Sequence, residues 1–392
     1  MKVAFLTLGC KVNQVETEHL ISEAINRGDE VVDFDSAADV YIVNTCTVTA
    51  VADQKSRQMI RRALKHESAR VIVTGCYANV AADEIRKIDP RIEIVSKDRD
   101  FPAAVSFHTR AFLKIEDGCE NFCSYCIIPY ARGKIRSKPL EQIRTDVENL
   151  VEHGTKEIVL TGIHLGAYGR DIKLHLSDAI KTCLEVKNLE RLRLSSLESI
   201  EFTEPILDLF ENPKLCRHLH LPLQSGSDKI LRLMRRPYDR KKFSTLIYAI
   251  RKKIPRLTLT TDVIVGFPNE SDDDFQDTIE FCQEMNFAKI HVFPFSPRPG
   301  TPAFEMTQVP PEIKKDRVER LLAVSNDLSK KFYEGFLNRT VSVLFEQKSG
   351  KFFTGHDEFY AKVFTSDSVE IGKIRDVRVH SLYKDGILGR VV

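Results

Sequence analysis

The sequence lacks any long apolar run and any recognisable export segment. No window of the 392-residue chain reaches 18 apolar residues, which excludes a membrane-spanning helix. The first apolar run, in MKVAFLTLGCKVNQ (1–14), is too short and too soon interrupted for a signal peptide. We therefore expect a cytoplasmic protein with no membrane partner.

The sequence also lacks a strong excess of charge. Its 58 Lys and Arg against 56 Asp and Glu give a net charge of +2. No global field draws the chain to nucleic acid, so any such site must be a local patch. The 42% apolar and 29% charged residues are typical of a globular chain, and the length favours two or three domains.

Cysteine is present in an odd number, nine, without an export signal. A disulfide framework is therefore not expected, and metal ligation or buried thiols become the default interpretation.

Residues 1–105 alternate between strand and helix patterns. VAFLTLG (3–9), VYIVNT (40–45) and VIVTG (71–75) are short apolar runs rich in β-branched residues, and helical patterns cover 14–27 and 51–65. Buried parallel strands with helical crossovers have this pattern. We expect an α/β domain with an open, doubly wound parallel sheet.

Residues 106–334 continue the alternation with a different spacing. The expected strands are FLKI (112–115), EIVLTG (157–162), RLRLSS (191–196), HLHLPL (218–223), LTLTTDVIVG (257–266) and KIHVFPF (289–295). Amphipathic stretches at 140–153, 176–187, 203–211, 227–251 and 271–285 separate them, and a helix is expected at 311–333. Six such units predict a partial (β/α)6 TIM barrel with its chemistry at the carboxyl ends of the strands.

Residues 335–392 consist of short strand patterns separated by turn residues, from VSVLFEQ to ILGRVV. This spacing predicts a small all-β barrel, a fold that often binds nucleic acid.

A cysteine cluster lies just after the first expected strand of the central barrel. CENFCSYC contains Cys119, Cys123 and Cys126 in a C-x3-C-x2-C spacing. Three thiolates so close fit one iron–sulfur cluster, and three ligands leave one iron open. Structural zinc is the alternative, but zinc normally takes four protein ligands and no fourth lies nearby. The motif, with Tyr125 before its last cysteine, resembles the radical S-adenosylmethionine (SAM) superfamily.

Three further cysteines each follow an expected parallel strand of the first domain. Cys10, Cys46 and Cys76 come directly after the runs at 3–9, 40–45 and 71–75. Parallel strand ends line one crevice, so we expect these thiols to converge on a second cluster; three buried thiols are the alternative. Cys183, Cys216 and Cys282 have no cluster spacing and are expected to be buried and inert.

The two triads in this order resemble the methylthiotransferase family over essentially the whole chain. The family has an N-terminal cluster domain, a radical SAM barrel and a C-terminal TRAM β-barrel that binds RNA. LGCKVNQ (8–14), NTCTVTAVADQKSRQ (44–58), TGCYA (74–78), TGIHLGAYG (161–169), LPLQSGSD (221–228) and SPRPGTPAF (296–304) are similar to the tRNA N6-threonylcarbamoyladenosine branch. The isopentenyladenosine branch more often has GCQMN where this chain has GCKVN. Asn269 replaces a usual Gly.

This resemblance implies that a methylthio group is added to C2 of the modified adenine at position 37, beside the anticodon. It implies two 4Fe-4S clusters, on Cys10, Cys46 and Cys76 and on Cys119, Cys123 and Cys126. It also implies SAM as methyl donor and radical source. The implied partners are the tRNA anticodon stem-loop, a flavodoxin- or ferredoxin-type electron donor and a sulfur donor.

Further SAM contacts are implied more loosely by position. Besides Tyr125, the candidates are Thr161 and Gly162 after the second barrel strand, Ser195, Ser196 and Glu198 after the third, and Gln224 and Ser225 after the fourth. Ordinary loop capping explains each of them equally well.

Two local basic stretches are candidates for RNA contact. Residues 232–253 contain nine Lys and Arg and a single acid, Asp239, although a solvated helix face is the commoner explanation of such a run. Lys134, Arg136 and Lys138, just after the cluster motif, lie closer to the expected substrate. The 335–392 barrel is only mildly basic, with nine Lys and Arg against seven Asp and Glu.

Two alternative functions stay open from the sequence. One is a relative that methylthiolates an aspartate of a ribosomal protein. The other is a non-catalytic iron–sulfur RNA-binding sensor, which needs neither an open iron nor a cavity for SAM.

Overall fold

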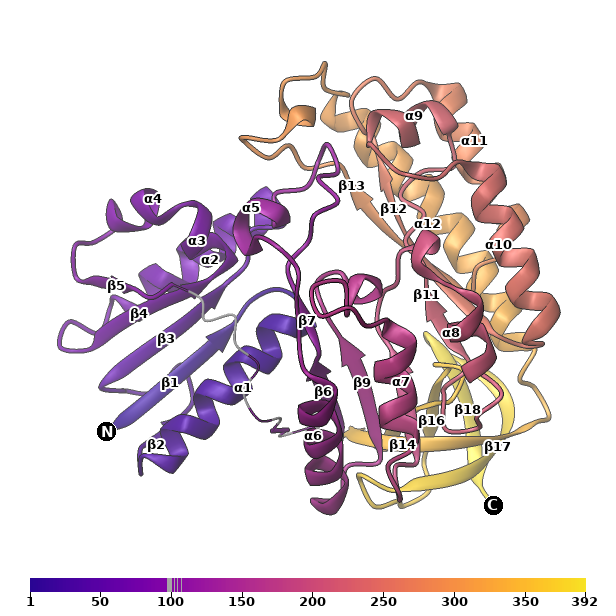
Figure 1. The fold of residues 1–392 in the computed structure, drawn as a ribbon, viewed down its shortest axis with the longest axis horizontal. Coiled ribbons are helices and arrows are strands. Elements are labelled where there is room, and N and C mark those ends of the chain that lie inside the picture. The colour runs from indigo at the N-terminus through magenta and orange to yellow at the C-terminus, as the bar shows by residue number, and fades with distance from the viewer. Residues whose placement is uncertain (97–100, 102, 104, 107) are drawn as a thin grey trace.

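The computed structural model describes residues 1–96, 101, 103, 105–106 and 108–392. The N-terminal part is an all-parallel sheet of five strands in the order β2-β1-β3-β4-β5. These strands are β1 (Lys2–Thr7), β2 (Glu30–Val32), β3 (Val40–Thr45), β4 (Arg70–Gly75) and β5 (Ile92–Ile94). Helix α1 (Lys11–Asn26) covers one face, and α2 (Ala50–Ala63), α3 (Cys76–Val80) and α4 (Ala82–Arg86) lie on the other (Figure 1). The predicted doubly wound parallel sheet is confirmed.

The expected boundary at 105/106 falls in a stretch where 97–100, 102, 104 and 107 lie outside the described residues. Six parallel strands follow it. They are β6 (Arg110–Lys114), β9 (Glu157–Thr161), β10 (Arg191–Leu194), β11 (His218–His220), β12 (Thr258–Val265) and β13 (Lys289–Pro294). Single bridges such as Ser196 to His220 join the β10 side to β11, so the six form one curved wall. The partial barrel is as predicted.

Helices cover the outside of this wall (Figure 1). They are α6 (Leu140–Glu152), α7 (Leu176–Leu184), α8 (Glu204–Leu209), α9 (Asp228–Leu233), α10 (Arg240–Lys253), α11 (Asp272–Met285) and α12 (Pro311–Glu334), with short 3-10 turns at Leu165–Ala167, Ser199–Glu201 and Pro302–Phe304. A large apolar core lies between the strands and these helices, because β9 and β10 are buried at every position. No helix in the described part of the chain has the length and apolarity needed to cross a membrane.

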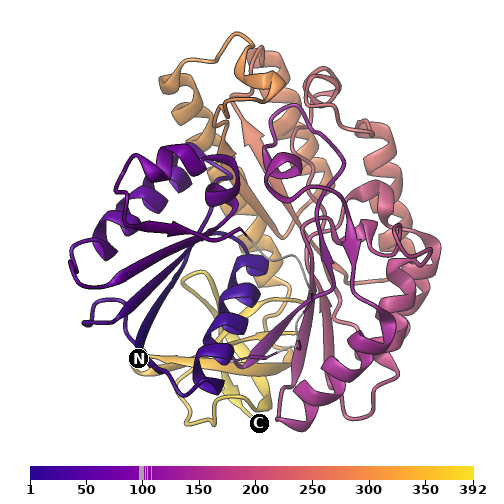
Figure 2. The same ribbon diagram turned by 60° about the vertical axis from the view of Figure 1, so that its left-hand side comes forward.

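The C-terminal strands close into a five-stranded barrel in the order β14-β15-β16-β18-β17. They are β14 (Thr340–Ser349), β15 (Phe352–Asp357), β16 (Lys362–Thr365), β17 (Ile374–Tyr383) and β18 (Gly386–Val391). Arg191 and Arg193 of β10 donate to main-chain oxygens of this barrel, including those of Ser342 and Asp357. The small barrel therefore sits against the amino-terminal end of the large one (Figures 1 and 2).

Two local features differ from the sequence expectation. The amphipathic stretch 227–251 is divided into α9 and α10, because Arg235 takes a positive φ of 57° just before Pro237 and Asp239 then caps α10. A short hairpin of β7 (Glu116–Asp117) and β8 (Arg136–Ser137), with α5 (Ile128–Arg132) between them, brackets the cysteine motif and was not predicted.

Candidate functional site

Cys10, Cys46 and Cys76 follow the neighbouring strands β1, β3 and β4 at the carboxyl edge of the N-terminal sheet. Cys10 caps α1 and is exposed, whereas Cys46 and Cys76 are buried. Gly9 adopts a φ of 108°, and a Cβ at this position would lie 3.0 Å from Cys46 Sγ, so the loop bearing Cys10 rests directly on Cys46. Burial raises the pKa of Cys46, and the neighbouring Cys76 and Cys10 add to this effect. The three thiols thus share one crevice.

Cys119, Cys123 and Cys126 lie on the loop between β7 and α5. Burial raises the pKa of Cys119 and of Cys126 to about 12, so these thiols are neutral without a metal. Arg236 donates to Cys123 Sγ at 3.2 Å, and Cys119 Sγ lies 3.7 Å from His164 Nδ1. The loop is therefore held from two sides by barrel residues.

A pocket of about 250 Å³ opens beside this loop. Tyr125 and Cys126 line it from the loop, Gln224 and Asp262 line it from the barrel, and most of its remaining surface is apolar. Two of the sequence candidates, Tyr125 and Gln224, therefore face a cavity next to Cys126.

The other candidates for SAM contact are placed differently. Thr161 ends β9 and is buried, and Gly162 packs on Glu116, where a side chain would collide with the carboxylate. Burial raises the pKa of Glu116 to about 8, and its Oε1 has no hydrogen-bond partner among the described residues. Glu116 is thus a buried carboxyl group close to Cys119 with one unpartnered oxygen, and the sequence analysis missed it.

Ser195, Ser196 and Glu198 do not line the pocket beside Cys126. Ser195 and Ser196 face a larger cavity inside the barrel. Glu198 is instead paired with Arg236, which also holds Cys123. Glu198 therefore supports the loop of Cys119, Cys123 and Cys126 through Arg236. Ser225 is buried and does not line the pocket beside Cys126. Its hydroxyl oxygen lies 3.4 Å from that of Thr278.

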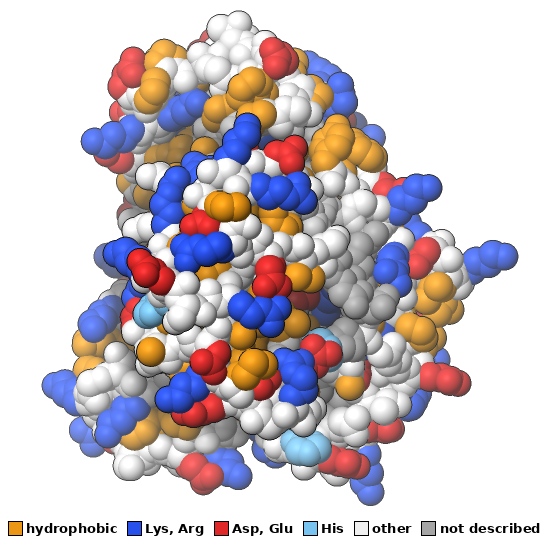
Figure 3. Space-filling model, turned by 90° about the vertical axis from the view of Figure 1, so that its left-hand side faces the viewer, with side chains coloured by type: hydrophobic (Ala, Val, Ile, Leu, Met, Phe, Trp, Pro, Cys, Tyr) orange, Lys and Arg blue, Asp and Glu red, His pale blue; other side chains and the backbone are white. Residues whose placement is uncertain are grey.

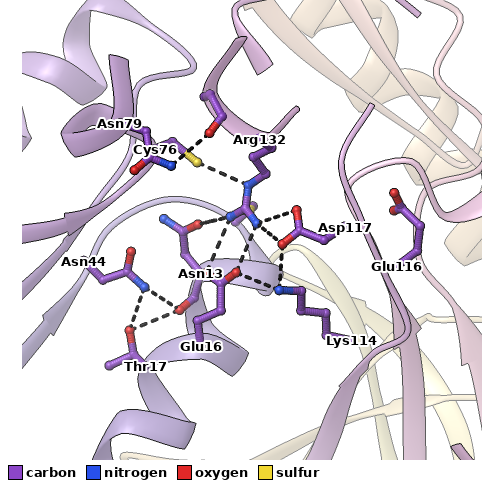
Figure 4. Close-up of polar contacts among 12 residues, drawn as sticks. Asn13, Glu16, Thr17, Asn44, Cys76, Asn79, Lys114, Glu116, Asp117 and Arg132 are labelled. Carbon is purple, nitrogen blue, oxygen red and sulfur yellow. Dashed lines mark hydrogen bonds and ion pairs between the residues drawn. The ribbon is translucent and has the colours of Figure 1, made fainter. Parts of the chain in front are cut away.

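A buried polar network centred on Arg132 joins the N-terminal part, including Cys76, to the segment that follows the central cysteine motif (Figure 4). Arg132, six residues after Cys126, donates to Cys76 Sγ at 3.3 Å and to Asn13 Oδ1 at 2.7 Å. It also contacts Glu16 and Asp117, each at 3.0 Å. The guanidinium group of Arg132 thus contacts α1, the start of α3 and the β7–β8 hairpin. This hairpin flanks the central loop, which carries Cys119, Cys123 and Cys126.

Lys114 completes this network from β6, at 2.7 Å from Asp117 and 3.1 Å from Glu16 (Figure 4). Burial alone would raise the pKa of Asp117, but Arg132 and Lys114 lower it to about 2. On the opposite side, Arg298 donates to Thr47 and Asp53 of the N-terminal part, at 2.8 and 2.6 Å. Buried charge pairs therefore fix the two triads relative to one another.

The larger cavity, about 610 Å³, occupies the lumen of the barrel. It shares Asp262 and Phe293 with the pocket beside Cys126, so the two spaces adjoin. On the wall of the larger cavity, possible metal ligand atoms of His220, Asp262 and His291 lie within 4.8 Å of one another. The signal for these histidines was present in the sequence, since they lie on expected strands.

The basic candidates for RNA contact are only partly accessible. Lys138 is buried and paired with Asp146, and Arg236 is buried at the cluster loop, so neither is available to a phosphate. Arg136 and Lys134 are exposed. On the face shown in Figure 3, basic and acidic side chains are interspersed rather than gathered in a single basic field.

Comparison with known proteins gives matches over nearly the whole chain. The family model described as "Uncharacterized protein family UPF0004" matches residues 2–96, and the Radical SAM superfamily model matches residues 113–282. Among solved structures, the radical S-adenosylmethionine methyltransferase TsrM from Kitasatospora setae has a TM-score of 0.57 at 13% identity, covering 77% of this chain and 74% of its own. This last likeness shows the fold alone.

Curated relatives are closer in sequence. The chain is 40% identical to "Threonylcarbamoyladenosine tRNA methylthiotransferase MtaB" of Bacillus subtilis (strain 168), over 100% of this chain and 97% of the relative. It is 37% identical to the protein of the same name from Thermotoga maritima, over 97% and 95%. It is 32% identical to "tRNA-2-methylthio-N(6)-dimethylallyladenosine synthase" of Clostridium tetani, over 95% and 92%. The chain therefore belongs to the radical S-adenosylmethionine methylthiotransferase family.

Proposed function

We propose that this chain adds a methylthio group to C2 of N6-threonylcarbamoyladenosine at position 37 of tRNA, using two SAM molecules and two 4Fe-4S clusters. The observation that carries the proposal is the contact of Arg132, six residues after Cys126, with Cys76 Sγ and with Glu16 of the N-terminal part. The names of the relatives with 37–40% identity support this base as the substrate. Relatives named for the dimethylallyl base are 30–36% identical, and the four named for the threonylcarbamoyl base are 35–40% identical.

The residues of each triad fit a cluster with one open iron. Each site offers three thiols, and the remaining cysteines, Cys183, Cys216 and Cys282, are buried elsewhere in the barrel. Soft thiolates select iron–sulfur clusters, and a three-ligand set leaves a coordination position for a small chelate. The adjoining pocket beside Cys126 and the unpartnered Glu116 Oε1 suit the polar end of SAM.

When bound, the central cluster and SAM supply a carbon-centred radical, which can remove the non-acidic hydrogen at C2 that no acid–base pair can take. The residues of this chain prepare the space for that step. Arg236 and His164 fix the central loop through Cys123 and Cys119. Apolar side chains of the pocket, such as Ile264 and Phe295, exclude water from it.

Arg132 has a second role at the N-terminal site. By donating to Cys76 and to Asn13, it ties the N-terminal cysteine site to the segment that follows the loop of Cys119, Cys123 and Cys126. The sulfur to be transferred must approach the same adenine carbon as the radical, so a fixed separation between the sites is required.

We assign residues 1–105 to a cluster domain, 106–334 to the SAM barrel and 335–392 to a TRAM domain that holds the anticodon stem-loop. The closed five-stranded barrel and its seat against β10 support the last assignment. Exposed Lys134 and Arg136 are proposed phosphate contacts near the cluster loop. A flavodoxin- or ferredoxin-type reductant and a sulfur donor complete the reaction in the cytoplasm.

The test is anaerobic reconstitution of the full chain with iron, sulfide and dithionite. The assay supplies SAM and an anticodon stem-loop carrying N6-threonylcarbamoyladenosine, and mass spectrometry measures the nucleosides. The 2-methylthio product is expected, with about eight irons per chain. Formation of 5′-deoxyadenosine without methylthiolated nucleoside would refute the proposed substrate.

A matched pair of variants separates the two sites. Cys46→Ala is expected to lower the iron content to about four per chain, the content of one cubane. Cys183→Ala, at a buried cysteine of α7 outside both triads, is the control and is expected to keep about eight. Equal iron contents in the two variants would contradict the second cluster.

A further inference from the structure

The cavity in the barrel lumen has a surplus of basic side chains. It is lined by alternating inward-facing residues of the strands, and residues of the C-terminal barrel such as His356 and Tyr360 close its lower end. Its volume of about 610 Å³ lies in the range of small-molecule sites. The charged lining residues are two acids and five bases: Asp262, Asp385, Lys11, Arg110, Arg193, Lys289 and Lys362.

Three of these basic groups already have acidic partners. Arg193 donates to Glu157 at 2.7 Å, Arg110 lies 3.1 Å from Glu346, and Lys362 lies 2.9 Å from Asp385. These ion pairs hold the cavity wall in place. The other two lysines of the wall are Lys11 and Lys289.

Of these two lysines, Lys11 is the one next to the N-terminal triad, and in the described part of the chain its ammonium group contacts an aromatic ring and no carboxylate. Its Nζ lies 5.7 Å from the ring centroid of Phe112, and no carboxylate of the described residues pairs with it. The side chain is exposed, so a ligand can reach it. Lys11 directly follows Cys10 in the sequence, and it also lines the lumen. It therefore lies between the N-terminal thiols and this cavity.

The field inside the cavity favours an anion. Burial would raise the pKa of Tyr360, but the charges of Arg110 and Lys11 lower it below its ordinary value. Arg110 and Lys11 therefore make the electrostatic potential positive around the Tyr360 hydroxyl, where the lumen meets the C-terminal barrel.

We infer that this lumen binds the threonylcarbamoyl side chain of the substrate base, with Lys11 as the ion-pair partner of its carboxylate. The inference rests on the proposed function and adds the residue that distinguishes an acidic base modification from a neutral one. The lumen and the pocket beside Cys126 share Asp262 and Phe293, so an adenine ring at this junction lies next to the SAM pocket while its N6 substituent extends into the lumen. The threonyl carboxylate supplies the negatively charged partner that the Lys11 ammonium group lacks. A neutral dimethylallyl group would leave this ammonium group without one.

An RNA phosphate carries the same kind of charge, so the experiment must separate the two sources. Two stem-loops are prepared that differ only in the threonyl carboxyl group, which is free in one and a methyl ester in the other. Their phosphates are identical. The reconstituted full chain receives both in one tube, and mass spectrometry gives the ratio of the two kcat/KM values, which does not depend on the fraction of active enzyme.

Wild-type chain is expected to prefer the acid about tenfold or more, the range for a hydrogen bond to a charged group. Lys11→Gln is expected to bring this ratio to about one, and Lys11→Arg to restore most of the preference because the charge is kept. Lys87→Gln, at an exposed lysine of the N-terminal part, is the control and keeps the wild-type ratio. Equilibrium binding of both stem-loops should show the same pattern.

The possible failures are distinguishable. If wild-type chain cleaves SAM but modifies neither stem-loop, the proposed function is wrong and this inference falls with it. If it modifies both equally, the function stands and the lumen does not read the carboxylate. If the preference persists in Lys11→Gln, another group binds the carboxylate. If Lys11→Gln weakens binding of acid and ester by the same factor, Lys11 contacts a phosphate instead.

Discussion

Replacement of Arg132 by methionine should destabilise the chain by about 3 kcal/mol. Arg132 is 3% exposed and donates to side chains of α1, α3 and the β7 hairpin. Removing one partner of a buried ion pair costs about 3–5 kcal/mol, because the other charge stays buried. The lower figure applies here, since Lys114 still lies 2.7 Å from Asp117 after the change.

The assay is urea unfolding of the reduced, metal-free chain under anaerobic conditions. The chain has no tryptophan, so circular dichroism is the suitable signal. Arg86→Met is the matched control: Arg86 is exposed and pairs with Asp83 at 2.9 Å on the surface, an interaction worth about 0.5 kcal/mol. Hydrogen exchange then shows where stability is lost: peptides from α1 and α3, which Arg132 contacts, should exchange faster in Arg132→Met.

A double variant tests the electrostatic part of this reasoning. In the Arg132→Met background, Asp117→Asn removes the carboxylate that has lost one of its two cationic partners, while Lys114 keeps Glu16 at 3.1 Å. The two changes should therefore cost less together than the sum of the single changes. Strict additivity, or a loss for Arg132→Met no larger than for Arg86→Met, would refute a buried ion-pair network between the two triads.

Three further predictions concern separate parts of the chain. Gly75→Ala should cost about 2 kcal/mol or more, because φ is 97° and a Cβ would overlap the main chain of β3, whereas Gly154→Ala, with positive φ but open space, should cost only about 1. Cys123→Ala should abolish 5′-deoxyadenosine formation, and Cys46→Ala should retain it while losing methylthiolation; the reverse pattern would exchange the two cluster roles. Burial raises the pKa of Asp357 to about 7, so the folded state holds its proton more tightly. The contribution of Asp357 to stability is therefore full below about pH 4 and is lost as pH rises to about 7, by about 4 kcal/mol at most. Asp357→Asn should remove this slope in hydrogen exchange of β15, and an unchanged slope would contradict the assignment.

The strands that carry the cysteines were predictable because their sequences are unambiguous. VYIVNT and VIVTG are buried on both sides of a parallel sheet, so they are apolar throughout, and the observed strands begin and end within one residue of the prediction. The short edge strands β2 and β5 were missed, since three residues with partial exposure give no periodic pattern. The hairpin of β7 and β8 was missed because its two-residue strands consist mostly of charged residues.

The residues that join the two triads could not be found in the same way, because burial is decided by contacts between distant segments. In the sequence, Arg132, Lys138 and Arg236 look like other basic residues near a nucleic-acid site. In the structure all three are buried and paired with acids that lie 8 to 116 positions away along the chain. A local charge run therefore predicts a basic surface only where nothing packs over it. Around the cysteine loops, the N-terminal sheet and the barrel bury these basic residues. Their ion pairs then hold the cysteine loops in position.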